Sequence, residues 1–321
     1  MPCLFITGQC RNVMTEQQKT PLADDEIDLR ELFKALWQGK WIIIVTTLLF
    51  SVAAVFYALS LSNIYKSEVT LAPVSEESGL KIPGQLGGLA ALAGVNLGGM
   101  GGGDKTGLAT EILKSREFLG RFIEENDLFL AIIAAEGWDR ESNRLLYDPK
   151  IYDVSASKWT RKAKAPFVAK PSVLETYEEI RKLISINKDK TTGMVRLSVE
   201  HYSPLLAKEW SEKLVQAINN EMRSRELVQA ERSIAYLNKQ IEQTNIADVR
   251  AMLYSLIEEQ TKTVMLANVR DEYVFETIDP AVVAEKKSKP NRILIIILAA
   301  MLSGILISFI VVIRYLNRRS K

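Results

Sequence analysis

The sequence predicts an α+β fold, in which two transmembrane helices flank a domain with a small, membrane-proximal mixed sheet and a long, extended helical arm. Two apolar runs without a charged residue, Trp41–Leu61 and Ile293–Ile313, lie near opposite ends of the chain. Between them, short segments alternate apolar and polar residues, which is the pattern of strands with one buried face. A later segment repeats apolar residues every three or four positions, which is the period of a helix.

The two apolar runs have the length of membrane spans. Each has about twenty residues, which at 1.5 Å per residue crosses a hydrocarbon core about 30 Å thick. Arg30, Lys34 and Lys40 precede the first run, whereas only Lys66 closely follows it, so the N-terminus is expected in the cytoplasm. The expected organisation is a cytoplasmic segment at 1–40, spans at 41–61 and 292–313, a periplasmic domain at 62–291 and a cytoplasmic tail at 314–321.

The segment before the first span predicts a short helix on the cytoplasmic membrane surface. Asp28 with Glu31 resembles a capping box, and apolar residues then fall on one helical face. The residues before Met14 lack the basic start of a signal peptide, so both Met1 and Met14 stay open as the start of translation. Both cysteines of the chain lie in this early part, which predicts a periplasmic domain without disulfides.

Four strands are expected in the periplasmic domain. The first covers Tyr65–Leu71, directly after the first span and before Pro73. Leu183–Asn187 and Met194–Glu200 alternate on either side of the turn residues Asp189–Gly193, which predicts a hairpin. A late strand is expected at Tyr273–Ile278. These segments are far apart in the sequence, and we expect them to form one sheet close to the bilayer.

Residues 79–107 form a glycine-rich loop in this prediction. Its glycines surround apolar residues that we expect at a subunit contact or against a passing glycan chain. These candidates are Leu86, Leu89, Leu92, Leu97 and Met100. The end of the loop, Gly98–Gly103 before Lys105, looks like a phosphate-binding loop, but it lacks the preceding buried strand and the direct glycine-lysine step of that motif.

The region 205–276 is expected to be mainly helical and to form the arm. A seam of apolar residues steps by three and four from Leu227 to Ile241, through Ala230, Ile234 and Leu237. The helix formers are weaker near Asn245, and beyond it the seam resumes. It then runs through Val249, Leu253, Leu256, Gln260 and Val264. If the helix bends at Asn245, its second part returns toward the sheet.

The sequence offers little for catalysis. His201 is the only histidine, so a metal cluster or a Ser-His-Asp triad would have to rest on it alone. It ends a predicted strand just before Ser203-Pro204, and a structural role is expected for it. The formal net charge of +2 gives no reason to expect a nucleic-acid partner. We therefore expect no enzymatic activity, no cofactor and no bound metal.

Small residues recur in both spans at a spacing that permits close helix packing. Ala300, Gly304 and Ser308 occupy every fourth position of the second span, and Ala54 with Ala58 forms a shorter series in the first. They are candidate contacts with another subunit or with a membrane polymerase. Contact with the chain's own other span is an equally open interpretation.

Two motifs resemble those of the Wzz-type polysaccharide co-polymerases, the chain-length determinants of bacterial surface polysaccharides. They are Ile27-Asp28-Leu29-Arg30-Glu31-Leu32 with Trp37 and Lys40-Trp41 before the first span, and Arg270-Asp271-Glu272-Tyr273 with Ile278-Asp279-Pro280-Ala281 before the second. Within the second motif and its linker, Arg270, Asp271, Tyr273, Asp279, Pro280 and Pro290 are the candidate residues. The family often has several prolines here, whereas this linker has only Pro280 and Pro290.

The resemblance implies a function and a set of partners. It implies a non-enzymatic homo-oligomer in the inner membrane, a ring of about eight subunits, that regulates the modal length of O-antigen or a related surface polysaccharide. The implied partners are a membrane polysaccharide polymerase, the growing lipid-linked glycan and the bilayer. The alternative is a component of capsule or exopolysaccharide export that works with a separate cytoplasmic tyrosine kinase and an outer-membrane exporter. A ligand sensor is disfavoured because the sequence shows no output domain.

Overall fold

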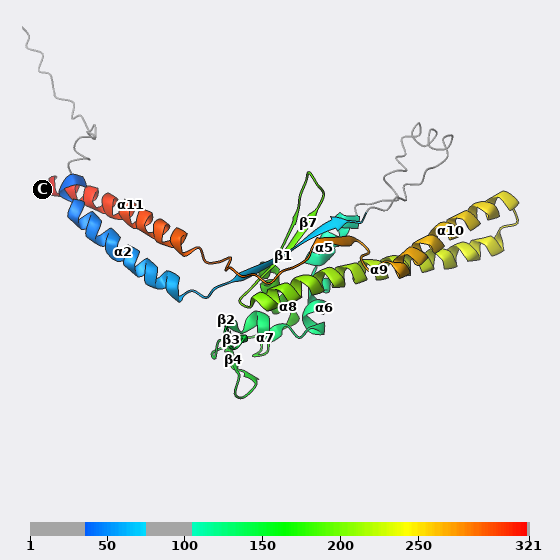
Figure 1. Ribbon diagram of the computed structural model, residues 1–321, viewed down its shortest axis with the longest axis horizontal. Helices are drawn as coiled ribbons and strands as arrows, with labels where there is room; N and C mark the ends of the chain where they lie inside the picture. The colour runs from blue at the N-terminus through cyan, green and yellow to red at the C-terminus, as the bar shows by residue number, and fades with distance from the viewer. Residues whose placement is uncertain (1–35, 75–104, 320–321) are drawn as a thin grey trace, which may run out of the picture. The chain divides into compact units, whose positions relative to one another are not determined.

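The computed structural model describes residues 36–74 and 105–319, which fall into two compact units (Figure 1). Unit 1 comprises residues 1–57 and 293–321, and unit 2 comprises residues 58–292. The proposed start at Met14 and the surface helix before residue 36 therefore lie outside the described residues.

Unit 1 consists of two apolar helices, α2 (Lys40–Ser60), whose last turn enters unit 2, and α11 (Arg292–Arg319). Lys40–Ser60 has 21 residues and Arg292–Arg314 has 23, and both stretches are long and apolar enough to cross a membrane. Most of their large apolar side chains are exposed in the isolated chain, among them Trp41, Leu48 and Leu302. Such all-round apolar surfaces are typical of helices that face lipid. Helix α11 continues beyond the expected end of the span, because no glycine or proline interrupts residues 314–319.

Unit 2 is built on a four-stranded sheet with the order β6-β7-β1-β8. Its strands are β1 (Tyr65–Pro73), β6 (Ile184–Lys188), β7 (Val195–His201) and β8 (Phe275–Asp279). Every pairing is antiparallel, so the expected mixed sheet is wrong. The reason is topological. The β6–β7 hairpin must be antiparallel, and β1 leads away from the first span while β8 leads back to the second.

Helices α5 (Lys105–Lys114), α6 (Arg116–Glu125), α8 (Val173–Leu183) and the first half of α9 (Pro204–Gln243) bury the apolar core with this sheet. Leu197 of β7 and Trp210 of α9 are among its fully buried side chains. The predicted C-terminal boundary of the glycine-rich loop, residue 107, is three residues too late, since Lys105–Gly107 already belong to α5. Buried Thr106 and Ala109 start the apolar face of that helix.

The arm is an antiparallel helical hairpin of α9 and α10 (Ala247–Val269) (Figure 1). The predicted break is confirmed, because α9 ends at Gln243 and the chain turns through residues 244–246. One detail of the prediction is wrong. The helical region ends at Val269 rather than at 276. The seam is also incompletely covered, because Leu256 is 40% exposed although it faces Leu237 of α9, whereas Ala230, Ile241 and Leu253 are buried.

Two small hairpins, which sequence reasoning missed, follow the short helix α7 (Phe129–Ile133). They are β2 (Ala135–Asp139) with β3 (Arg144–Tyr147), and β4 (Tyr152–Asp153) with β5 (Lys158–Trp159). Their strands are too short for a clear alternation. Ring contacts of Tyr152 with Tyr147 and Trp159, at 6.2 and 5.2 Å between centroids, join the two hairpins.

Candidate functional site

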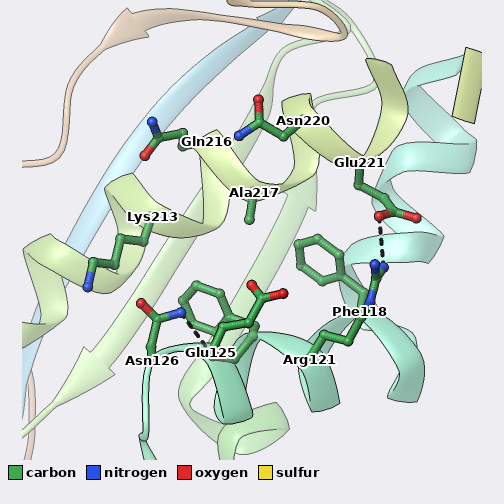
Figure 2. A pocket seen from close by; sticks show the side chains of 10 residues that line it. Phe118, Arg121, Glu125, Asn126, Lys213, Gln216, Ala217, Asn220 and Glu221 are labelled. Carbon is green, nitrogen blue, oxygen red and sulfur yellow. Dashed lines mark hydrogen bonds and ion pairs between the residues drawn. The ribbon is translucent and has the colours of Figure 1, made fainter. Parts of the chain in front are cut away.

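A polar groove of about 370 Å³ lies between α6 and α9 (Figure 2). Ser115 caps α6 by accepting a hydrogen bond from the amide of Phe118, and it thereby fixes which helix face turns to the core. Phe118 and Phe122 are then buried in the core and also border the groove. The rim carries charged and amide side chains from both helices, including Arg121, Glu125 and Gln216.

Glu221 organises one end of the groove. Its carboxylate accepts from Nη2 of Arg121 at 2.8 Å and from Nε of Arg225 at 2.5 Å, and it thus ties α6 to α9. Burial alone would raise the pKa of Glu221, but the hydrogen bonds from Arg225 and Arg121 outweigh it, and its pKa is lowered. The same bond to Glu221 raises the pKa of Arg121. This end is therefore a fixed ionic contact.

The other end of the groove carries further hydrogen-bonding groups. Asn126 donates from Nδ2 to the carbonyl of Phe122 at 3.0 Å, and this bond leaves its Oδ1 to accept from a ligand. Figure 2 shows the carboxylate of Glu125 pointing from α6 toward Ala217 of α9, and Gln216 also borders the groove from α9. Amide and carboxylate groups of this kind bind hydroxyl groups. The groove is therefore lined by groups that can bind a polyhydroxylated ligand.

The motif before the second span lies where the arm returns to the sheet. Arg270 caps α10 through its backbone, Asp271 is exposed 3.9 Å from Arg223, and Tyr273 is buried. Asp279 ends β8 opposite Thr70. Pro280 is exposed, and Pro290 follows Lys289, whose backbone bridges to Ile64.

Asn219 of α9 is the central residue of this return, and sequence reasoning missed it. Its Oδ1 accepts from the amides of Val274 and Phe275, and its Nδ2 donates to the carbonyl of Phe275, all at 2.9 Å. The side chain is 3% exposed. The available signal was an asparagine at a position that continues the apolar face of Val215, Ile218 and Met222.

Arg292, the first residue of α11, joins the start of that helix to the last turn of α2 and the residues after it, within unit 2. Its Nε donates to the carbonyl of Ala58 at 3.0 Å, and its Nη2 donates to Oδ1 of Asn63 at 3.2 Å. Lys289 adds an ion pair of 2.6 Å with Glu200 at the end of β7. Ala58, one of the predicted small-residue contacts, is thus buried beside this arginine.

The small residues of α11 face the chain's own first span at one position. A Cβ on Gly304 would lie 3.8 Å from Oγ1 of Thr47 in α2. Ser303 is buried, whereas Ala300, Ser308 and Ala54 are half-buried. Gly304 therefore contacts the other span of its own chain. Contact of these residues with another subunit or with a polymerase stays a prediction.

The remaining candidates divide between described and undescribed parts of the chain. Leu86, Leu89, Leu92, Leu97 and Met100 lie outside the described residues. His201 is buried, with Nε2 3.0 Å from the carbonyl oxygen of Ala131 and Nδ1 accepting from the amide of Ser203 at 3.1 Å, as a structural histidine does. In ranges 36–74 and 105–319, no cluster of three His, Cys, Asp or Glu side chains could hold a metal ion.

Comparison with known families gives a match for the first third of the chain. Residues 25–126 match the model of the family Wzz, described as chain length determinant protein. This segment is a Wzz chain length determinant domain. The Wzz domain contains α2, β1, α5 and α6, and it therefore supplies the first candidate span, a central strand and the α6 wall of the groove.

The other comparisons add less to the Wzz assignment. No curated protein matches the chain. Among solved structures, the chain is similar to one titled full-length bacterial polysaccharide co-polymerase, at 14% identity over 91% of this chain and 99% of that chain. The TM-score is 0.37, so this likeness supports no detail of the fold.

Proposed function

We propose that this protein is a non-enzymatic scaffold of the bacterial inner membrane that sets the modal length of O-antigen or a related surface polysaccharide by modulating a membrane polymerase. The observation that carries the proposal is the Wzz domain at residues 25–126. A scaffold role is also compatible with the groove between α6 and α9, whose charged and amide side chains can bind hydroxyl groups.

The arrangement of the chain supports a two-pass protein. Helices α2 and α11 have the length and composition of spans, and unit 2 lies between them in the sequence. With the basic residues Arg30, Lys34 and Lys40 before the apolar run that starts at Trp41, we place both termini in the cytoplasm and unit 2 in the periplasm. In this topology, unit 2 is the part of the protein that contacts a growing glycan.

The arm supports assembly into a homo-oligomer. It exposes large apolar side chains along both helices, which in a soluble region indicates a protein contact. They include Val228, Tyr236, Met252, Tyr254, Met265 and Val269, and Ile246 in the turn between the helices is exposed as well. We propose that neighbouring arms cover them in a ring of identical subunits, about eight by family resemblance, and that the spans contact the polymerase within the bilayer.

We propose the groove between α6 and α9 as a contact for the growing glycan. Replacing Glu125 and Gln216 together by alanine removes hydrogen-bonding groups of both α6 and α9 from the groove, while the Arg121–Glu221 pair stays. We expect this double variant to shift the modal length of the polysaccharide. The control is Glu178→Ala with Gln243→Ala, two exposed positions outside the groove. An unchanged modal length at normal protein level would remove the groove from the proposal.

The function as a whole is tested by the length distribution of surface polysaccharide on a silver-stained gel, with the gene deleted and then restored. Loss of a modal cluster of long chains while polymer is still made, with recovery on restoration, is the expected result. Complete loss of surface glycan, or unchanged lipopolysaccharide, would contradict the proposal and favour the export role with a separate kinase and exporter.

A further inference from the structure

A basic lobe, residues 140–170, projects from unit 2 and has no role in the function proposed above. It contains the end of the first small hairpin, the second hairpin and the segment before α8. Its residues 154–170 hold five basic residues and no acidic one. The basic residues of this stretch are Lys158, Arg161, Lys162, Lys164 and Lys170.

The lobe also exposes apolar side chains beside these cations. Leu146 is 53% exposed, Val154 60%, Phe167 54% and Val168 64%. Exposed apolar groups interspersed with lysines are the composition of surfaces that lie on a membrane, where the apolar groups enter the interface and the cations meet lipid phosphates.

Internal hydrogen bonds hold the segment that carries Phe167 and Val168. Arg161 donates from Nε to the carbonyl of Ala169 at 2.7 Å and from Nη2 to that of Val168 at 2.8 Å. The same guanidinium pairs with Glu175 of α8 at 2.9 Å. The guanidinium of Arg161 is therefore occupied by contacts within the protein, and its bonds to the carbonyls of Val168 and Ala169 close the loop between residues 161 and 169. Lys158, Lys162 and Lys164 are exposed on this fixed segment.

Contacts within unit 2 place the base of the lobe next to the end of the first span. Ser62 follows the last residue of α2 by two positions, so it lies within about 7 Å of the helix end along the chain. A Cβ on Gly137 of β2 would lie 3.7 Å from Oγ of Ser62, and the ring of Trp138 meets that of Tyr65 edge-on at 5.7 Å. Strands β2 and β3 thus lie beside the residues at which the chain leaves α2.

The lobe continues from that point as one packed piece. The Tyr147, Tyr152 and Trp159 ring contacts connect β3 to β4 and β5, and the amide of Thr160 donates to the carbonyl of Ile151 at 2.9 Å. Within unit 2, Figure 1 shows β2, β3 and β4 at the end where β1 begins, opposite to the α9–α10 turn.

We propose that residues 154–170 dock on the outer leaflet of the same membrane, with Phe167 and Val168 at the interface and Lys158, Lys162 and Lys164 on anionic phospholipid headgroups. The proposal rests on α2 being a span, as in the function proposed above. The partner is a lipid surface, because the cations and the exposed apolar groups lie together at the end of unit 2 where the chain leaves that span. The expected consequence is a second, peripheral anchor that holds unit 2 against the bilayer.

The test uses the full chain in liposomes, with Cys3 and Cys10 replaced by serine and one fluorophore-labelled cysteine introduced. Val168→Cys reports on the lobe, and Ile246→Cys at the arm tip is the matched control, since both native side chains are 64% exposed. The quencher is a nitroxide on the lipid headgroup. In vesicles with phosphatidylglycerol we expect most of the fluorescence at position 168 to be lost and that at position 246 to be kept.

The charge dependence decides whether lipid phosphates are the partner. Quenching at position 168 should be lost in about 1 M salt, where the screening length is about 3 Å, and in vesicles of phosphatidylcholine alone. It should also be lost in the variant Lys158→Glu, Lys162→Glu, Lys164→Glu, but not in Lys239→Glu, Arg250→Glu, Lys262→Glu, which reverses three exposed charges on the arm.

Three results would overturn the proposal. They are no quenching at position 168 in anionic vesicles, equal quenching in every lipid and salt condition, and a label that responds to a soluble anionic polysaccharide but not to lipid. The quenching assay contains no polysaccharide, so its outcome is independent of the function proposed above. If deleting the gene left the polysaccharide length distribution unchanged, the proposed function would be wrong, but quenching at position 168 would still show that the lobe docks on lipid.

Discussion

At the scale of the residue, two buried polar side chains connect distant parts of unit 2. Asn219 satisfies three backbone groups of the returning chain at residues 274 and 275, and His201 joins the end of β7 to the carbonyl of Ala131 after α7 begins. Buried polar groups stabilise a fold only when they are paired, so each of these residues has a stability effect that can be measured.

Replacing Asn219 by leucine should destabilise unit 2 strongly. The amides of Val274 and Phe275 would lose their shared acceptor and stay buried, which costs about 2–4 kcal/mol. Denaturant unfolding of the full chain in detergent, followed by tryptophan fluorescence, measures the change. Asn220→Ala, one position along and exposed, should shift the midpoint little. Equal midpoints for Asn219→Leu and the wild type would show that these bonds contribute nothing.

His201 should make stability depend on pH between neutral and mildly acidic conditions. Burial lowers its pKa below the usual value of about 6.5, so the unfolded chain binds the proton more readily than the folded one. Stability from the neutral ring is therefore fully present above about pH 6.5 and is lost as pH falls toward the lowered pKa. Unfolding midpoints at a series of pH values measure this slope, and His201→Gln should flatten it. A wild-type profile without a slope there would contradict the assignment.

At the scale of the element, the helices set what each part of the chain can contact. The hairpin of α9 and α10 buries a narrow seam and leaves apolar side chains on its outer faces, and α2 and α11 meet at a glycine. A narrow buried stripe in a long hairpin means that most of its surface is free for other partners.

Gly304→Leu should disturb the packing of α11 on α2. A single Cβ at this position fits, since it would lie 3.8 Å from Thr47 Oγ1, but a leucine adds three more carbons toward the same wall. We expect a lower thermal midpoint in detergent and a smaller particle mass, because the altered pair presents a different surface to other subunits. Gly304→Ala is the control and should retain both values. A leucine variant of unchanged mass would show that assembly does not need this position.

At the scale of the whole molecule, assembly should depend on the exposed face of the arm. Tyr236, Met252 and Met265 are each more than half exposed, so replacing them together by glutamate leaves the buried residues of the hairpin, Ala230, Ile241 and Leu253, unchanged. If neighbouring arms cover these side chains, the buried charges would break the contact and reduce the particle mass in detergent. Thermal midpoints should change little.

The matched control for the arm adds the same three charges at polar positions. Gln243→Glu, Ser255→Glu and Thr261→Glu lie on exposed parts of the same two helices. Their particle mass should equal that of the wild type. A normal mass for the variant of Tyr236, Met252 and Met265 would mean that the arms do not carry the assembly.

The sequence by itself determined the features that depend on local pattern. Length and apolarity specified both candidate spans, alternation located the strands beside Tyr65 and around Asp189–Gly193, and weak helix formers near Asn245 located the turn of the arm. The motifs near Ile27 led to the Wzz resemblance, and the family match covers that first segment. Each of these signals is contained within a few tens of consecutive residues.

Only the tertiary structure decided which distant residues meet. Four features join segments separated by tens to hundreds of positions. They are the antiparallel order β6-β7-β1-β8, the hydrogen bonds of Asn219 to Phe275, the hydrogen bond of Arg292 to Ala58 and the groove between α6 and α9. No local periodicity records such pairs, because their stability comes from packing and hydrogen bonds that exist only after the chain has folded. The basic lobe was missed for a related reason. Its strands are short, and its position beside Ser62 depends on contacts that only the folded chain makes.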